Sequence, residues 1–136
     1  MKLLFVCGEN ACRSQMAEAF ARHHGGGRVE AYSAGSKPRG SVDETATVVM
    51  REKGVPLSGH TSKGLSVLPS VEWDALITMG CGDACPTLPA KRRIDWNIPD
   101  PARQPIEFYR RVRDTIDAAV TQLLQEFDGA NGPPRA

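Results

Sequence analysis

The sequence has no excess of charge of one sign. Its 136 residues include 17 Lys and Arg against 16 Asp and Glu, which gives a formal net charge of +1. A protein that binds nucleic acid or an anionic membrane through its overall field carries a clear positive excess. The near-neutral total therefore argues against a bulk polyanion binder, and we expect neither nucleic acid nor a membrane as a partner.

A long apolar run is also missing. No stretch approaches the ~20 apolar residues that cross a bilayer. The opening segment 1–6 is too short for the apolar part of a signal peptide, and no small-residue cleavage site follows it. We therefore expect a cytoplasmic protein. Thiols stay reduced in that compartment, so the four cysteines are expected to be reactive or metal-binding rather than disulfide-bonded.

Strand-like and helix-like segments alternate along the chain. Short apolar segments favour strands, and apolar residues at steps of three or four favour helices. The expected strands are 2–6, 28–33, 74–79 and 93–96. The expected helices follow caps at Ser14 and at Ser41 or Asp43, and a third begins near Pro105. The pattern predicts a single α/β domain over residues 1–128, with a four-stranded parallel sheet flanked by helices, and a flexible tail at 129–136.

The segment from Cys7 to Ser14 carries the strongest chemical signal. It reads Cys-Gly-Glu-Asn-Ala-Cys-Arg-Ser and lies between the first strand and the first helix. A loop that enters a helix can point backbone N–H groups at one spot, where the helix dipole also favours negative charge. Arg13 can add a planar fork of donors for a tetrahedral oxyanion. The predicted oxyanion-binding residues are Gly8, Glu9, Asn10, Ala11, Cys12, Arg13 and Ser14.

Cys7 lies at the mouth of this predicted cradle. The positive field of the loop favours the thiolate form of Cys7, and Ser14 can donate a hydrogen bond to its sulfur. A thiolate aimed at a bound oxyanion is a nucleophile for a displacement reaction. Cys12, in contrast, is expected to pack as a small apolar residue rather than to react.

These motifs resemble the low-molecular-weight protein tyrosine phosphatase fold and, within it, the arsenate reductases. The Cys-x5-Arg-Ser string is shared by both branches. Ser-Gln-Met-Ala-Glu at 14–18, Tyr-Ser-Ala-Gly at 32–35 and His-Thr-Ser at 60–62 are similar to the reductase branch. The resemblance implies a phosphatase-like fold with the oxyanion loop after the first strand, arsenate as substrate and no cofactor.

The resemblance also implies a relay of three thiols in arsenic detoxification. Cys81 and Cys85 stand where thioredoxin-coupled reductases carry two further cysteines, and Asp100-Pro101 resembles the family's general-acid loop. Cys7 would attack arsenate held by Arg13, and Asp100 would protonate the departing oxygen. Cys81 would then attack the sulfur of Cys7. Cys85 would finally form a disulfide with Cys81, which thioredoxin or a similar dithiol reduces.

The spacer between the two relay cysteines is shorter than in the best-known thioredoxin-coupled members. Residues four apart on a helix rise by about 6 Å along its axis. Because the Cα atoms of a disulfide lie about 4.4–6.8 Å apart, Cys81 and Cys85 could bridge in a helical turn. The short spacer is therefore compatible with the relay.

Some members of this fold bind potassium beside the loop. They use residues like Asn10, Glu18 and Ser33 together with an acidic residue just after the His-Thr-Ser motif. This sequence has Lys63 at that position. We expect the ammonium of Lys63 to pair with Glu18 in place of the cation, so we predict no metal and no potassium requirement.

Two other functions use some of the same residues. A low-molecular-weight phosphatase would hydrolyse phosphate monoesters through a phosphorylated Cys7, with Arg13 and Asp100, and would need neither Cys81 nor Cys85. Alternatively, the four cysteines could hold a structural zinc in a binding module. Zinc knuckles favour two residues between paired cysteines, whereas these pairs are separated by four and three residues, so we favour the reductase.

Overall fold

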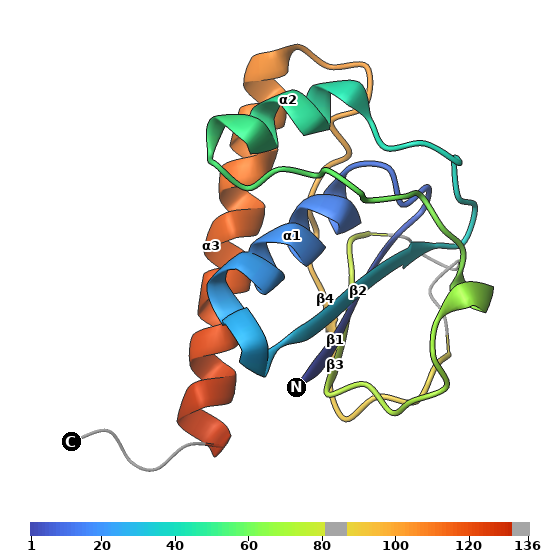
Figure 1. Cartoon of the computed structure of the whole chain (residues 1–136), viewed down its shortest axis with the longest axis vertical. Coiled ribbons are helices and arrows are strands. Elements are labelled where there is room, and N and C mark those ends of the chain that lie inside the picture. Colours follow the sequence, from blue (N-terminus) through green and yellow to red (C-terminus); the bar gives the residue numbers. More distant parts are fainter. Residues whose placement is uncertain (81–86, 132–136) are drawn as a thin grey trace.

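The described part of the chain forms a four-stranded parallel sheet. The computed structural model describes residues 1–80 and 87–131, so Cys81 and Cys85 lie outside it. The strands are β1 (Lys2–Cys7), β2 (Glu30–Gly35), β3 (Ala75–Thr78) and β4 (Arg93–Asp95). Their order across the sheet is β2-β1-β3-β4, and each neighbouring pair is parallel (Figure 1). The predicted α/β class and parallel sheet are confirmed.

β1 lies at the centre of the sheet and is buried on both faces. Side chains alternate between the two faces of a strand. Leu3 and Phe5 therefore contribute to the core under the helices, whereas Leu4 and Val6 pack against the segment 65–73 on the opposite face. This two-sided burial is what a continuous apolar run favours in a parallel sheet.

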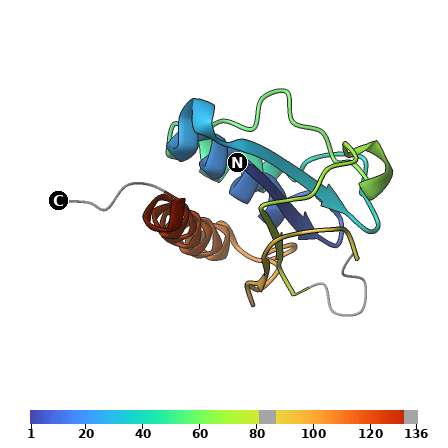
Figure 2. The ribbon, with the colours of Figure 1, turned by 90° about the horizontal axis from the view of Figure 1, so that it is seen from below.

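Three α-helices pack into the larger of the two cores. They are α1 (Arg13–Gly25), α2 (Glu44–Glu52) and α3 (Ile106–Asn131), and short 3-10 turns occupy 26–28 and 65–67. Figures 1 and 2 show α1 and the long α3 side by side, and α1 lies against β1 and β2. No helix within residues 1–80 or 87–131 combines the length and the apolarity needed to cross a membrane.

The ends of the helices differ from the prediction in two places. Ser14 is not the cap of α1, because Cys12 occupies the cap position and the Ser14 hydroxyl instead contacts the sulfur of Cys7. The helix α3 continues to Asn131, beyond the predicted domain end at residue 128. A single glycine costs a helix only about 1 kcal/mol relative to alanine, so Gly129 does not end it. Asp43 caps α2, as one of the two predicted candidates.

The carboxyl ends of the strands meet at one edge of the sheet. Cys7 ends β1 and pairs in register with Gly35, the last residue of β2. The residue Met79 follows β3, and Asp100 lies a few residues beyond the end of β4. Ligands bind at this edge in parallel α/β sheets, and the predicted loop lies there.

Candidate active site

The loop between β1 and α1 turns its carbonyl groups outward. Three backbone N–H groups from the following segment donate hydrogen bonds to these carbonyls. They run from Lys37, Arg39 and Asp43 to the oxygens of Gly8, Glu9 and Ala11, at 2.8, 3.0 and 2.8 Å respectively. A trans peptide points its N–H opposite to its C=O. The outward pairing therefore favours loop N–H groups that face the enclosed pocket, as an anion cradle requires.

Two backbone positions give the loop its shape. Asn10 adopts a left-handed conformation with φ of 50°, which asparagine tolerates better than most residues. Gly35 on β2 lies directly beneath the loop. A Cβ on residue 35 would lie 2.6 Å from the carbonyl oxygen of Gly8 and 2.8 Å from the backbone nitrogen of Asn10. Only glycine lets β2 approach the loop this closely.

The loop borders a small, partly open cavity of about 20 Å³. The residues that line it are Cys7, Glu9, Ala11, Cys12, Arg13, Arg39, Asp43, Asp100 and Ala102. The structure thus brings the predicted nucleophile, the predicted arginine and the predicted general acid to one cavity. Gly8, Asn10 and Ser14 are not among the residues that line it.

The sulfur of Cys7 is the end of a chain of hydrogen bonds. Cys7 Sγ lies 2.9 Å from Ser14 Oγ, and Asn10 Nδ2 donates to the same hydroxyl oxygen at 2.8 Å. Asn10 Oδ1 accepts from the backbone N–H of Lys63 at 2.9 Å, which fixes the orientation of the amide. Because the Ser14 oxygen already accepts from Asn10, its own hydrogen is free to point at the sulfur. The arrangement suits a thiolate, which accepts a hydrogen bond but donates none.

The series of hydrogen bonds behind Cys7 continues to His60, which no sequence pattern connects to the loop. Gln15 Nε2 is surrounded by three acceptors: Asn10 Oδ1 and Thr61 O at 2.9 Å, and Asn10 O at 3.0 Å. The amide oxygen of Gln15 must therefore face His60 Nδ1, at 2.8 Å. That oxygen can only accept, so Nδ1 of His60 carries a hydrogen. Burial lowers the pKa of His60, against the opposing charge of Glu18.

Arg13 is held by backbone carbonyl groups in the segments that follow β3 and β4. Its Nη1 donates to the carbonyl oxygens of Met79, at 2.5 Å, and of Ile98, at 2.8 Å. Its Nη2 lies 3.9 Å from Asp100 Oδ2. The Asp100 side chain is half exposed, and its Oδ1 accepts from the backbone N–H of Ala102. The guanidinium is therefore fixed beside the cavity, with the carboxyl group of Asp100 at the rim.

The buried carboxylate of Glu18 is the centre of a cluster of polar side chains. Lys63 Nζ lies 3.5 Å from Glu18 Oε1 and 3.3 Å from Ser33 Oγ, and Ser33 donates to Glu18 at 2.6 Å. Arg22 pairs with the second oxygen of the same carboxylate at 3.2 Å. The expected pairing of Lys63 with Glu18 is confirmed, whereas the absence of a potassium requirement stays a prediction.

The two relay cysteines are not placed relative to this cavity, because Cys81 and Cys85 lie outside the described residues. Their predicted roles, and the alternative of a zinc bound by four cysteines, stay predictions. Within the described ranges, no group of three or more His, Cys, Asp or Glu side chains is arranged to hold a metal ion.

The sequence of the chain is similar to a known family along almost its whole length. Residues 2–131 match the family described as low molecular weight phosphotyrosine protein phosphatase. The glutaredoxin arsenate reductase of Synechocystis sp. is 36% identical over 129 residues, which cover 93% of this chain and 98% of that protein. The arsenate reductase of Staphylococcus aureus is 36% identical over 122 residues, covering 87% and 92% respectively.

Solved structures show the same similarity. An arsenate reductase in the phosphate-binding state has a TM-score of 0.83 and 35% identity, with 92% of this chain and 97% of that chain covered. The thioredoxin-dependent arsenate reductase of Corynebacterium glutamicum has a TM-score of 0.79 and 32% identity, with 96% and 63% covered. The arginine phosphatase of Geobacillus stearothermophilus has a TM-score of 0.78 and 28% identity, with 98% and 99% covered.

Proposed function

Because the chain belongs to the low molecular weight phosphotyrosine protein phosphatase family, and because arsenate reductases match it along most of its length, we propose that it reduces arsenate to arsenite. The observation that carries the proposal is the position of Cys7. Its sulfur lies 2.9 Å from the Ser14 hydroxyl oxygen, and Cys7 lines a cavity that Arg13 and Asp100 also line.

The first step is a displacement at arsenic. Arsenate binds in the loop cavity, where the inward N–H groups and the guanidinium of Arg13 stabilise its negative charge. The Cys7 thiolate attacks the arsenic atom and forms a sulfur–arsenic bond. A hydroxyl group of the bound arsenate leaves the arsenic, takes a proton from Asp100 at the rim and departs as water.

The second step supplies two electrons. The thiol of Cys81 loses its proton and attacks the sulfur of Cys7. The sulfur–arsenic bond breaks, its electron pair stays on arsenic, and arsenite leaves. Cys85 then attacks Cys81 and releases Cys7 as a thiolate, so that the oxidation ends as a Cys81–Cys85 disulfide. An external dithiol reduces this disulfide, which requires the reducing conditions of the cytoplasm, where arsenic detoxification would take place.

We favour thioredoxin as the reductant, because a relay that ends in an intramolecular disulfide suits a dithiol. The similarity to the thioredoxin-dependent reductase of Corynebacterium glutamicum supports this choice, and the similarity to the glutaredoxin arsenate reductase of Synechocystis supports the alternative. Oxidation of NADPH coupled to each reductant system in turn separates them: we expect the faster arsenate-dependent rate with thioredoxin and thioredoxin reductase.

The test of the proposed function uses the same coupled assay. Wild-type protein is expected to oxidise NADPH only when arsenate is present. Cys81→Ser and Cys85→Ser should both lose multiple turnover, because each removes one thiol of the relay. If both variants matched the wild type, the relay would be wrong; if the wild type left arsenate unreduced with either reductant but hydrolysed phosphate monoesters, the chain would be a phosphatase.

A further inference from the structure

Two thiols line the same anion-binding cavity. Cys7 and Cys12 both contribute to its wall, and both are free cysteines with exposed fractions of only 3% and 6%. A cradle that stabilises negative charge favours a thiolate at either position. Ser14 contacts the sulfur of Cys7, which favours that thiolate but does nothing to prevent ionisation of Cys12. The structure must therefore contain a second feature that distinguishes the two.

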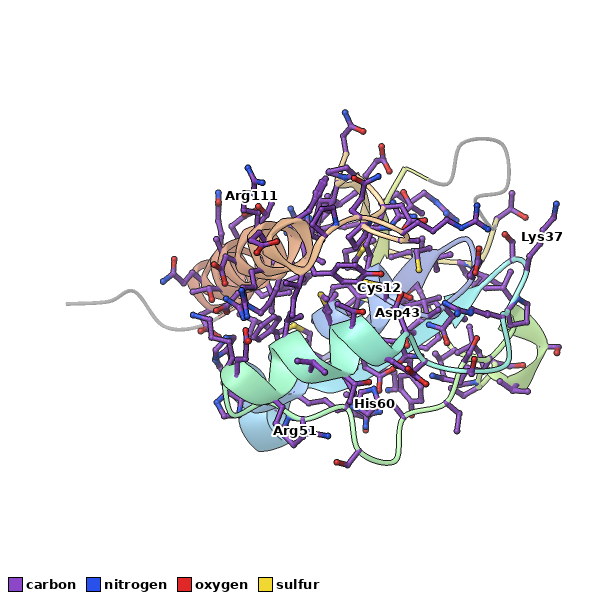
Figure 3. All side chains as sticks on the ribbon, turned by 90° about the horizontal axis from the view of Figure 1, so that it is seen from above. Cys12, Lys37, Asp43, Arg51, His60 and Arg111 are labelled. Atoms are coloured by element: carbon purple, nitrogen blue, oxygen red, sulfur yellow. The ribbon has the colours of Figure 1, made fainter. Side chains whose placement is uncertain are left out.

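Asp43 places a fixed negative charge beside Cys12 (Figure 3). Its side chain is 7% exposed. Oδ1 accepts from the backbone N–H groups of Thr45 and Ala46, at 2.8 and 3.1 Å, and Oδ2 accepts from the Tyr109 hydroxyl at 2.8 Å. Arg39 Nη1 lies 3.8 Å from Oδ2. With these donors the carboxylate has one orientation and cannot turn away from the cavity.

Most of the groups around Cys12 raise its pKa. Burial raises the pKa of Cys12 most, and the negative charge of Asp43 comes next; Cys7 and Asp100 add to the rise, and only Arg13 opposes it. The pKa of Tyr109 is also raised, by burial and by its bond to Asp43, so its hydroxyl stays a donor. Cys12 therefore remains a neutral thiol at a pH where a free cysteine begins to ionise.

We propose that Asp43, held by Tyr109, selects the nucleophile of the loop by keeping Cys12 protonated, so that only one of the two loop thiols attacks the oxyanion. Asp43 is thus a positioning residue, which acts through Cys12. The consequence for arsenate rests on the proposed function: a neutral Cys12 is a poor nucleophile toward the sulfur of the Cys7–arsenic adduct. It does not form a Cys7–Cys12 disulfide and release arsenite early, and this attack is left to Cys81.

The proposal is tested by alkylation of each cysteine with iodoacetamide as a function of pH, followed by peptide mass spectrometry, without arsenate or reductant. Asp43→Asn removes the charge but keeps a good helix cap. We expect the pH midpoint of Cys12 alkylation to fall by about one unit. At a pH below the midpoint, Cys12 should then react about tenfold faster than in the wild type. A merely structural loosening would expose Cys12 and raise the plateau rate, so a lower midpoint at an unchanged plateau rate supports the proposal; an unchanged midpoint, or a fall that comes only with a higher plateau rate, would overturn it.

Two further variants complete the design. Glu44→Gln removes an equal charge from the exposed neighbouring residue, which does not line the cavity, and should leave the Cys12 midpoint in place. Asp43→Ser, whose hydroxyl also caps a helix, replaces Asp43→Asn if that variant does not fold. If the Cys12 midpoint shifted as far in Glu44→Gln as in Asp43→Asn, the specific role of Asp43 would be refuted. Since arsenate is absent, failure here leaves the proposed function untouched.

Discussion

Gly35→Ala tests whether the close approach of β2 shapes the oxyanion loop. The added Cβ would meet the carbonyl oxygen of Gly8 at 2.6 Å, the nitrogen of Asn10 at 2.8 Å and the carbonyl oxygen of Cys7 at 3.0 Å. All three neighbours are backbone atoms, which cannot rotate away as a side chain can. Ordinary contact begins near 3.4 Å, so the loop must retreat by about 0.8 Å.

The magnitude follows from that displacement. Overpacking of this kind costs about 1–3 kcal/mol of folding stability. A misplacement of about 1 Å at the reacting groups costs up to about a hundredfold in rate. We therefore expect Gly35→Ala to fold with a lower melting temperature and to lose about a hundredfold in kcat/KM for arsenate. The loss should exceed what its stability change alone produces.

The assay compares arsenate reduction and thermal melting for Gly35→Ala and a matched control. Gly27→Ala is the control, because a Cβ at residue 27 meets nothing within 4 Å. Protection of Cys7 from iodoacetamide by added arsenate gives a second readout of binding in the loop. If Gly35→Ala remained folded and bound arsenate with an affinity within twofold of the wild type, the steric argument would be wrong.

Three further predictions concern side chains around the loop. Ser14→Ala removes the donor to the Cys7 sulfur, and a hydrogen bond to a charged group contributes about 1.5–3 kcal/mol; alkylation of Cys7 at neutral pH should slow at least tenfold, and an unchanged rate would contradict the donor assignment. The ammonium of Lys63 pairs with Glu18, so calorimetry should show no stoichiometric potassium binding to the wild type, whereas Lys63→Asp should bind potassium; binding to the wild type would refute this. Asparagine can place a donor where His60 places Nδ1, so His60→Asn should retain a faster Cys7 alkylation rate than His60→Ala; equal rates would show that the bond to Gln15 does not reach the sulfur.

The sheet and the loop were predictable because their signals are local. The continuous apolar run of β1 predicts a strand buried on both faces, and the string from Cys7 to Arg13 directly after it predicts an anion cradle. Local signals were less reliable at helix ends. Ser14 is a good cap by residue type, but its hydroxyl contacts the Cys7 sulfur, and the helix begins two residues earlier than a Ser14 cap would give, with Cys12 at the cap position.

The supports of the site depend on contacts between residues far apart in the sequence, which no local pattern contains. Gln15 meets His60 across 45 positions, and Asp43 meets Tyr109 across 66. Each residue alone has an ordinary explanation, as a helix residue, a loop residue or a helix cap. Their functional meaning appears only when the fold brings the pairs together behind the loop.

A single-turnover experiment tests the central claim most directly. Fully reduced protein is mixed with one equivalent of arsenate in the absence of any reductant, arsenite is quantified, and the disulfides are mapped by mass spectrometry. The account predicts up to one arsenite per chain, together with a Cys81–Cys85 disulfide, and no arsenite from Cys7→Ser. Arsenite released without that disulfide, or equal amounts from Cys7→Ser, would contradict it.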